Sequence, residues 1–234
     1  MTHRVITAVA TRMGTDANNA DAVAVFRSET GTTAACVVDM VGHAPTAPAV
    51  GRLCAETAAR VGAQRGALAG LVAAGALVAD PGAGEEPEPT GVAVLALASP
   101  GEETRLAWVG DCAAYGWDGT TLHPRTTPQS MGEFLRWNQD LDLAPEHDNW
   151  VRVDLATVVP TNVAVSSVPA SERLVLLVSD GVTDQVPHHL MEDLVRQHAT
   201  DPRALAQALV DAARAEPSGR RDDATVIVLD VPTA

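Results

Sequence analysis

Residues Arg173 to Asp184 read Arg-Leu-Val-Leu-Leu-Val-Ser-Asp-Gly-Val-Thr-Asp. The run from Leu174 to Ser179 is apolar up to its last, small polar residue, which is typical of a buried β-strand. The run stops at Asp180-Gly181, and Asp184 follows. A carboxylate at the mouth of a buried strand is costly unless something compensates its charge, and Mg²⁺ and Mn²⁺ prefer such oxygen ligands. Asp-Gly is also a strong turn signal, so this stretch alone is consistent with either a metal ligand or a plain turn.

Acidic residues stand at the ends of apolar runs in three further places. Asp39 follows Val37-Val38, Asp111 follows Trp108-Val109-Gly110, and Asp222-Asp223 precede the run that begins at Ala224. The repetition predicts that several carboxylates collect at strand ends.

At these residues the chain resembles the metal-dependent protein phosphatases, the protein phosphatase 2C-like family. S-D-G-V-T-D (179–184) resembles that family's S-D-G-[LV]-[TW]-[DE], and V-G-D-C-A-A-Y (109–115) resembles its V-G-D-S-R-A-Y. D-D-A-T-V-I-V (222–228) resembles its D-[ND]-x-T-V-[IV]-V. The motifs fit in order and spacing from about Val5 to Val231. The resemblance implies an α+β fold, a four-layer αββα sandwich of two antiparallel β-sheets flanked by helices, and the length favours a single domain over residues 1–234.

The resemblance also implies hydrolysis of phosphoserine or phosphothreonine in a phosphorylated protein substrate at a binuclear Mn²⁺ or Mg²⁺ centre. Two cations about 3.5–4 Å apart can activate a water and neutralise phosphoryl oxygens. The residues that match the family's main metal ligands are Asp39, which would bridge the ions, Asp180 and Asp222. Asp111 and Asp184 match a weaker third-metal site. Two further matches are Met40, through its backbone carbonyl, and Asp21, the last residue of the family's N-E-D triplet. His43 is either the proton donor to the leaving group or a solvated loop histidine.

Three positions depart from the family pattern. Ala20 replaces the Glu of N-E-D, and Met40 replaces a Gly, so that Met40 would be strained if the position required a positive φ. Asp16 stands where the family has a phosphate-binding Arg. Arg220 or Arg221 would suit phosphate in its place, although two Arg beside two Asp are also typical of surface ion pairs.

The composition excludes several other functions. The formal net charge is −14, which argues against nucleic acid or an anionic membrane as a partner. All 16 basic residues are Arg, which excludes lysine Schiff-base and P-loop chemistry. Three cysteines without C-x-x-C spacing, no signal peptide and no apolar run long enough to span a bilayer favour a cytoplasmic protein. Cys112 is interpreted as a buried, inert thiol rather than a nucleophile.

Periodicity and turn residues predict the individual elements. We expect residues 45–79 to be mostly helical, as two helices or as one helix broken near Gly62 to Gly66, and we expect a two-residue hairpin at Asp118-Gly119. Residues 138–149 are expected to form a loop where the family carries a variable flap. The remaining expected strands are 5–10, 22–26, 33–38, 91–98, 104–109, 112–117, 150–155, 162–168, 174–179 and 224–230, and the remaining expected helices are 134–137, 187–198 and 201–216.

Two other functions stay open from the sequence. The departures at Ala20, Met40 and Asp16 are also expected of a catalytically weak or inactive relative that serves as a binding or regulatory module. The missing Arg is also compatible with a small phosphorylated metabolite as the substrate. The sequence leaves the oligomeric state open.

Overall fold

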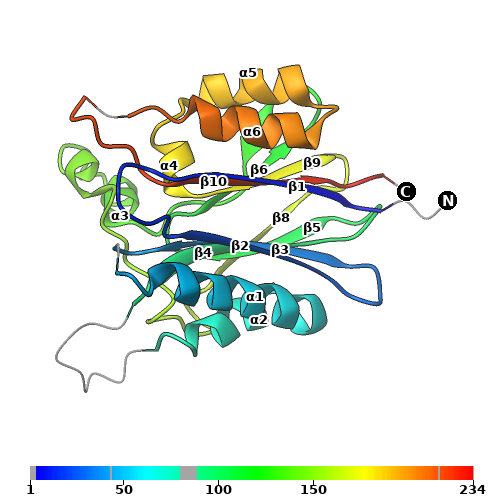
Figure 1. Cartoon of the computed structure of the whole chain (residues 1–234), viewed down its shortest axis with the longest axis horizontal. Coiled ribbons are helices and arrows are strands. Elements are labelled where there is room, and N and C mark those ends of the chain that lie inside the picture. The colour runs from blue at the N-terminus through cyan, green and yellow to red at the C-terminus, as the bar shows by residue number, and fades with distance from the viewer. Residues whose placement is uncertain (1–3, 43, 80–88, 216, 234) are drawn as a thin grey trace.

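Two five-stranded antiparallel sheets pack face to face and carry helices on both outer faces (Figure 1). The structure is a computed structural model that describes residues 4–42, 44–79, 89–215 and 217–233. One sheet has the strand order β1-β10-β9-β6-β7 and the other has the order β2-β3-β4-β5-β8. The predicted αββα fold is confirmed.

The strands follow the apolar runs of the sequence closely. The first sheet consists of β1 (Ile6–Arg12), β10 (Ala224–Asp230), β9 (Leu174–Val178), β6 (Ala113–Trp117) and β7 (Leu122–Pro124). The second consists of β2 (Asp21–Arg27), β3 (Thr33–Met40), β4 (Gly91–Ala98), β5 (Thr104–Val109) and β8 (Ala164–Val168). The strands β4, β9 and β10 are buried along their whole length, because a sheet covers one face and helices cover the other.

The helices cover the two outer faces in pairs. Helices α1 (Ala47–Arg65) and α2 (Ala67–Gly75) pack on the sheet that contains β2, β3 and β4. The predicted break in this stretch is confirmed, since Gly66 has a φ of +99° between the two helices. Helices α5 (His188–His198) and α6 (Pro202–Ala212) cover the opposite sheet (Figure 1). Small alanine side chains line α1 where it meets the sheet, which lets the layers approach closely.

The short helical elements gather at one end of the sandwich (Figure 1). They are α3 (Met131–Trp137), the 3₁₀ turn η1 (Ala144–His147) and α4 (Asp180–Thr183). Ser130 caps α3 by accepting a hydrogen bond from the Glu133 amide. In the described residues, no helix has both the length and the apolar character that crossing a bilayer requires.

Three predicted elements are wrong in detail: the strand at 150–155, the end of the last helix, and the two-residue hairpin at Asp118-Gly119. Residues 150–155 do not form a strand: Val151 makes one isolated bridge to Ser130. The last helix ends at Ala212 rather than 216, because the Arg12 guanidinium binds the carbonyls of Val210, Asp211 and Ala213 at the helix end.

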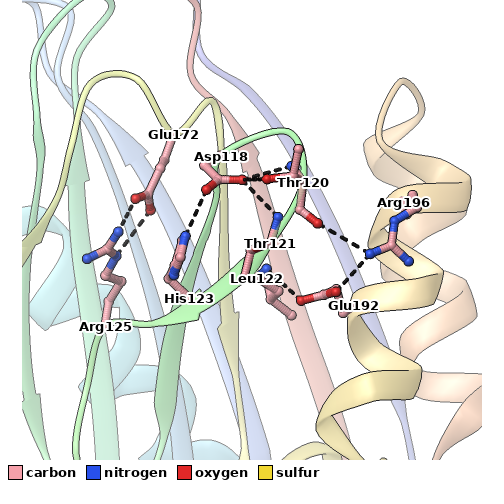
Figure 2. A network of polar contacts seen from close by, with 9 residues as sticks. All are labelled: Asp118, Thr120, Thr121, Leu122, His123, Arg125, Glu172, Glu192 and Arg196. Atoms are coloured by element: carbon pink, nitrogen blue, oxygen red, sulfur yellow. Dashed lines mark hydrogen bonds and ion pairs between the residues drawn. The ribbon is translucent and has the colours of Figure 1, made fainter.

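The hairpin between β6 and β7 has four loop residues, 118–121, rather than two. Trp117 pairs with Leu122, and the Asp118 carboxylate accepts hydrogen bonds from the amides of Thr120 and Thr121 (Figure 2). This side-chain cap replaces the backbone turn expected of Asp-Gly.

The same hairpin is fastened to its surroundings by charged side chains (Figure 2). On α5, Glu192 accepts a hydrogen bond from the Leu122 amide and Arg196 donates to the Thr120 carbonyl. Directly after β7, Arg125 forms an ion pair with the buried Glu172. These contacts fix the strand β7, which leads into residues 125–130.

Candidate metal and phosphate site

A cavity of about 250 Å³ opens at the end of the sandwich where several strands finish. Its lining brings together five of the predicted site residues, Asp39, Asp111, Asp180, Asp184 and Asp222. Met40 also lines the cavity, whereas Asp21 lies behind it, paired with Asp39 across β2 and β3. His43 lies outside the described residues.

The strand ends place each carboxylate. Asp39 stands near the end of β3, Asp180 opens α4 directly after β9, and Asp222 comes just before β10. Asp111 follows β5 through Gly110, whose φ of +85° turns the chain in a way that side chains disfavour. The positions remote in sequence therefore meet because antiparallel strands from both sheets end at the same edge.

A hydrogen-bonded bridge joins the two sheets behind the cavity. The Ser179 hydroxyl donates to Asp21 Oδ2 at 2.8 Å and accepts from the Thr225 amide at 3.0 Å. Asp21 therefore links β2 of one sheet to the ends of β9 and β10 in the other. Its second oxygen, Oδ1, is buried without a hydrogen-bond partner among the described residues, and the same holds for Asp180 Oδ1.

Burial and mutual repulsion raise the pKa of the central carboxyl groups. The pKa of Asp21 rises to about 7, and those of Asp111 and Asp180 rise to about 6. The pKa of Asp39 lies well above its usual range. Burial is the largest cause in each case, and the charges of neighbouring carboxylates add to it. Such a group of acids is electrostatically suited to a cation.

The donor set fits a hard divalent cation. All the candidate side-chain ligands are carboxylates, and the orphaned oxygens of Asp21 and Asp180 lack a positive partner. Among the described residues, however, no three acidic, histidine or cysteine side chains already stand as a complete ligand group. Asp222 turns to the Asp223 amide at 3.0 Å and to Arg220 at 3.4 Å. Binding an ion would replace such contacts.

Met40 can contribute its backbone but not its side chain. The side chain is buried in the core, where it fills the space above Gly51 in α1. Gln139 is the non-glycine residue with a positive φ in the described chain, so the strain considered for Met40 does not arise. Met40 lies within β3 in extended conformation.

The arginines near the site differ in where they point. Arg220 lines the cavity, with its guanidinium 3.4 Å from Asp222 and 4.0 Å from Asp16. Arg221 turns away and donates to the Met13 carbonyl at 3.0 Å. Arg12 caps α6. Of the two arginines that the sequence offers for phosphate, Arg220 is the one at the cavity.

Cys112 is fully buried beside the site. Burial and the adjacent carboxylates hold the pKa of its thiol well above the usual range. A neutral buried thiol is a poor nucleophile, which supports the structural interpretation of this residue.

Asp223 is a residue whose role the sequence did not separate from that of Asp222. Its carboxylate accepts hydrogen bonds from the amides of Gly14 and Ala20, both at 2.6 Å, and so ties residues 14–20 to the cavity wall. Gly181 packs so closely on the Asp223 carbonyl that an added Cβ would lie 1.9 Å from it. Two adjacent acids before a buried strand indicate that one of them needs internal hydrogen-bond donors, although they do not indicate which one.

Gln185 also lines the cavity and was not expected there. With its amide oriented to satisfy both neighbours, its oxygen accepts from the Asp222 amide at 2.7 Å and its nitrogen donates to the Arg214 carbonyl at 3.0 Å. It holds the backbone of Asp222 in place.

Known proteins resemble this chain in sequence over one part and in fold throughout. The family model of protein phosphatase 2C matches residues 140–221. No curated protein matches the sequence. The serine/threonine phosphatase of S. agalactiae superposes with a TM-score of 0.81 at 18% identity, covering 97% of this chain and 99% of that one.

Two further solved structures agree with that result. Serine/threonine phosphatase Stp1 from Staphylococcus aureus has a TM-score of 0.80 at 17% identity, with 99% of this chain and 96% of that chain covered. The PPM Ser-Thr phosphatase MsPP from Mycobacterium smegmatis, solved in complex with cacodylate, has a TM-score of 0.74 at 20% identity, with 98% and 100% covered. The similarity therefore extends over the whole fold.

Proposed function

We propose that this chain is a metal-dependent phosphatase of the protein phosphatase 2C-like family, whose model matches residues 140–221, and that it hydrolyses phosphoserine and phosphothreonine esters in proteins. The observation that carries the proposal is the convergence of Asp39, Asp111, Asp180, Asp184 and Asp222 on one cavity that Arg220 also lines. Carboxylates suit divalent cations, and a guanidinium suits a phosphoryl group. A cytoplasmic location fits the three free, buried cysteines.

The carboxylates divide into a main set and an outer set. Asp39, Asp180 and Asp222 would hold two Mn²⁺ or Mg²⁺ ions, with the Met40 carbonyl as a further ligand, directly or through water. Asp111 and Asp184 would hold a third, weaker ion. Bound divalent cations supply an activated water and neutralise charge on the phosphoryl oxygens. Asp21, which accepts a hydrogen bond from Ser179 and lies opposite Asp39 across β2 and β3, would support Asp39 from behind the cavity.

The other residues bind and position the substrate. Arg220 would bind the phosphoryl oxygens, since its guanidinium is solvent-accessible and its present ion pairs are loose. His43 is the proposed proton donor to the leaving serine or threonine oxygen. Asp223 and Gln185 keep the cavity wall and the backbone of Asp222 in position.

The decisive experiment measures hydrolysis of p-nitrophenyl phosphate and of a phosphothreonine peptide with Mn²⁺, with Mg²⁺ and with EDTA. Asp39→Asn and Asp180→Asn proteins, shown to be folded by circular dichroism, serve as comparisons. We expect turnover that requires metal and falls by at least about 100-fold in both variants, because each removes a ligand charge. Turnover in EDTA, or equal turnover in the variants, would refute the proposal.

A regulatory role without catalysis is the second candidate. It is favoured by Ala20, which provides no carboxylate where the family has Glu, and by the absence of a complete ligand group among the described residues. In that case Asp180→Asn would change stability or partner binding but not turnover. The same set of proteins therefore distinguishes the two functions.

A further inference from the structure

The cavity has a structured rim that exposes unusually many apolar side chains. We call residues 131–150, which contain α3 and η1, the rim segment. Large hydrophobic side chains are exposed at Trp137 (70%), Leu141 (64%), Trp150 (57%) and Leu143 (53%). The other two tryptophans, Trp108 in β5 and Trp117 in β6, are buried. A concentration of exposed apolar groups in one segment is typical of a binding surface.

The rim segment is held firmly at its base, so this exposure does not reflect a loose chain. The Met131 amide donates to the Trp150 carbonyl at 2.7 Å, and the bridge between Ser130 and Val151 closes the segment. Arg136 forms two 2.6 Å hydrogen bonds with the Asp148 carboxylate. Trp150 stacks on His147 with a centroid distance of 5.8 Å.

The segment continues directly into the cavity. Asn149 and Val151 line the cavity, and Arg136 with Asp148 lines an adjoining hollow of about 200 Å³ that shares Asp111, Asp180 and Asp184 with it. A polypeptide whose phosphorylated residue occupied the cavity would therefore cross the rim within the next few residues on one side, because an extended chain advances about 3.3 Å per residue.

The charge of the rim segment selects the occupant. Its acidic residues are Glu133, Asp140, Asp142, Glu146 and Asp148, against the single arginine Arg136. Arg136 is already paired with Asp148 and Glu133. Within the described chain, no basic side chain pairs with Asp140, Asp142 or Glu146. A second copy of this chain, nucleic acid and an anionic membrane would all be repelled by such a surface on a molecule of net charge −14.

We propose that the rim segment is the docking surface for the polypeptide around the phosphorylated residue, and that it selects substrates in which basic residues alternate with apolar ones. The apolar residues would cover Trp137 and Leu141, and the basic residues would pair with Asp140, Asp142 and Glu146. This inference rests on the proposed phosphatase function and adds its substrate class.

Two phosphothreonine peptides of equal length test the selection. One carries Arg and Leu on both sides of the phosphothreonine, and the other carries Glu and Ser; p-nitrophenyl phosphate, which is too small to reach the rim, reports the cavity alone. We expect kcat/KM to be at least about tenfold higher for the basic–apolar peptide, mainly through KM, with the difference shrinking at high salt.

Variants of the rim segment test whether it causes the preference for the basic–apolar peptide. Two multiple variants should each reduce the preference for the basic–apolar peptide at least threefold. The first combines Trp137→Ser with Leu141→Ser, and the second combines Asp140→Asn, Asp142→Asn and Glu146→Gln. Both should keep p-nitrophenyl phosphate turnover within twofold of the parent. Leu53→Ser, which changes an equally exposed leucine on α1, is the matched control and should change nothing.

Several results would overturn the inference. These are equal use of the two peptides, a preference that survives both sets of variants, an equal loss with p-nitrophenyl phosphate, or light scattering that shows a dimer abolished by Trp137→Ser. If no phosphate ester is hydrolysed, the proposed function fails by itself. Peptide binding is then measured in EDTA from the fluorescence of Trp137 and Trp150. Binding of the basic–apolar peptide alone would support the docking surface. Equal binding of both peptides, or binding of neither, would refute it.

Discussion

Arg220 stands between two carboxylates at the cavity mouth. Its guanidinium is 3.4 Å from Asp222 and 4.0 Å from Asp16, and 54% of its side chain is exposed. Exposed ion pairs at such distances contribute little stability, so a phosphoryl group can replace them at low cost. The neighbouring Arg221 has no such freedom, because it donates to the Met13 carbonyl and its backbone is tied to Thr15.

Arg220→Ala is expected to lower kcat/KM for phosphate esters by about 10- to 100-fold, because it removes one charge-assisted contact with the phosphoryl group. The change should lie mainly in KM, because the guanidinium binds the phosphoryl group before and during the reaction. Arg220→Lys should retain part of the activity, since it keeps the charge and loses the planar fork. Steady-state kinetics would measure the effect, with Arg203→Ala on the exposed face of α6 as the control. An unchanged KM would exclude this role.

At the scale of elements, the connection between β1 and β2 depends on β10. The amides of Gly14 and Ala20 both donate to Asp223. The Thr15 amide donates to the Arg221 carbonyl, and the Arg221 amide donates to the Thr15 hydroxyl. A Cβ on Gly14 would lie 2.4 Å from the Arg221 carbonyl, so the two segments are in direct backbone contact. The segment that carries Asp16 and precedes Asp21 is therefore positioned by residues 221–223, which lead into β10.

Asp223→Ala should lower the free energy of unfolding by about 2–4 kcal/mol, because it leaves two amides of the 14–20 segment without their charged acceptor. Asp223→Asn should cost less, since its amide oxygen still accepts one hydrogen bond. Urea denaturation gives the energies, and Asp211→Ala on the exposed face of α6 is the comparison. Limited proteolysis should find new cleavage within residues 13–20 in the Ala variant. Equal stability of all three variants would contradict this role.

Elements with strong periodic signals could be predicted from the sequence, and those decided by tertiary contacts could not. The apolar runs at β4, β9 and β10 predicted the strands correctly because burial on both faces leaves few alternatives. The alternation at 150–155 is equally regular, but its amides bond to Gln129 and to Gly91 rather than to a strand ladder.

The candidate site was predictable for similar reasons. Carboxylates at strand ends converge once the strands form a sandwich, so Asp39, Asp111 and Asp180 could be predicted together. Asp222 and Asp223 both line the cavity, but only the Asp223 carboxylate accepts from the amides of Gly14 and Ala20, and this difference depends on which side of the backbone each side chain leaves. The sequence alone contains no signal for that choice.

At the scale of the whole molecule, negative charge is concentrated where the sheets end. The formal net charge is −14, and the cavity alone is lined by Asp39, Asp111, Asp180, Asp184, Asp222 and Asp223. Holding these carboxylates together opposes folding when they are all ionised. The metal-free protein should therefore store an electrostatic penalty at this end that either protons or cations can relieve.

This penalty predicts how stability depends on pH. The folded pKa of Asp21 is about 7 and those of Asp111 and Asp180 are about 6, whereas an aspartate in an unfolded chain has a pKa of about 3.9. Between about pH 4 and pH 7 the folded chain therefore binds more protons than the unfolded chain, and the free energy of unfolding falls as the pH rises through this window. In EDTA, the Tm should drop by several degrees from pH 5 to pH 8.

Added Mn²⁺ should reverse the drop at pH 8 and have a much smaller effect at pH 5, because protons compete with the ion for the same carboxylates. Differential scanning fluorimetry across this range, with and without Mn²⁺, measures both effects. Asp21→Asn is the informative variant, since it removes the group with the pKa of about 7 and should flatten the pH dependence in EDTA. A Tm that rises from pH 5 to pH 8 without metal would show that the carboxylates are already compensated within the protein, and the electrostatic reason for a cation at this site would be lost.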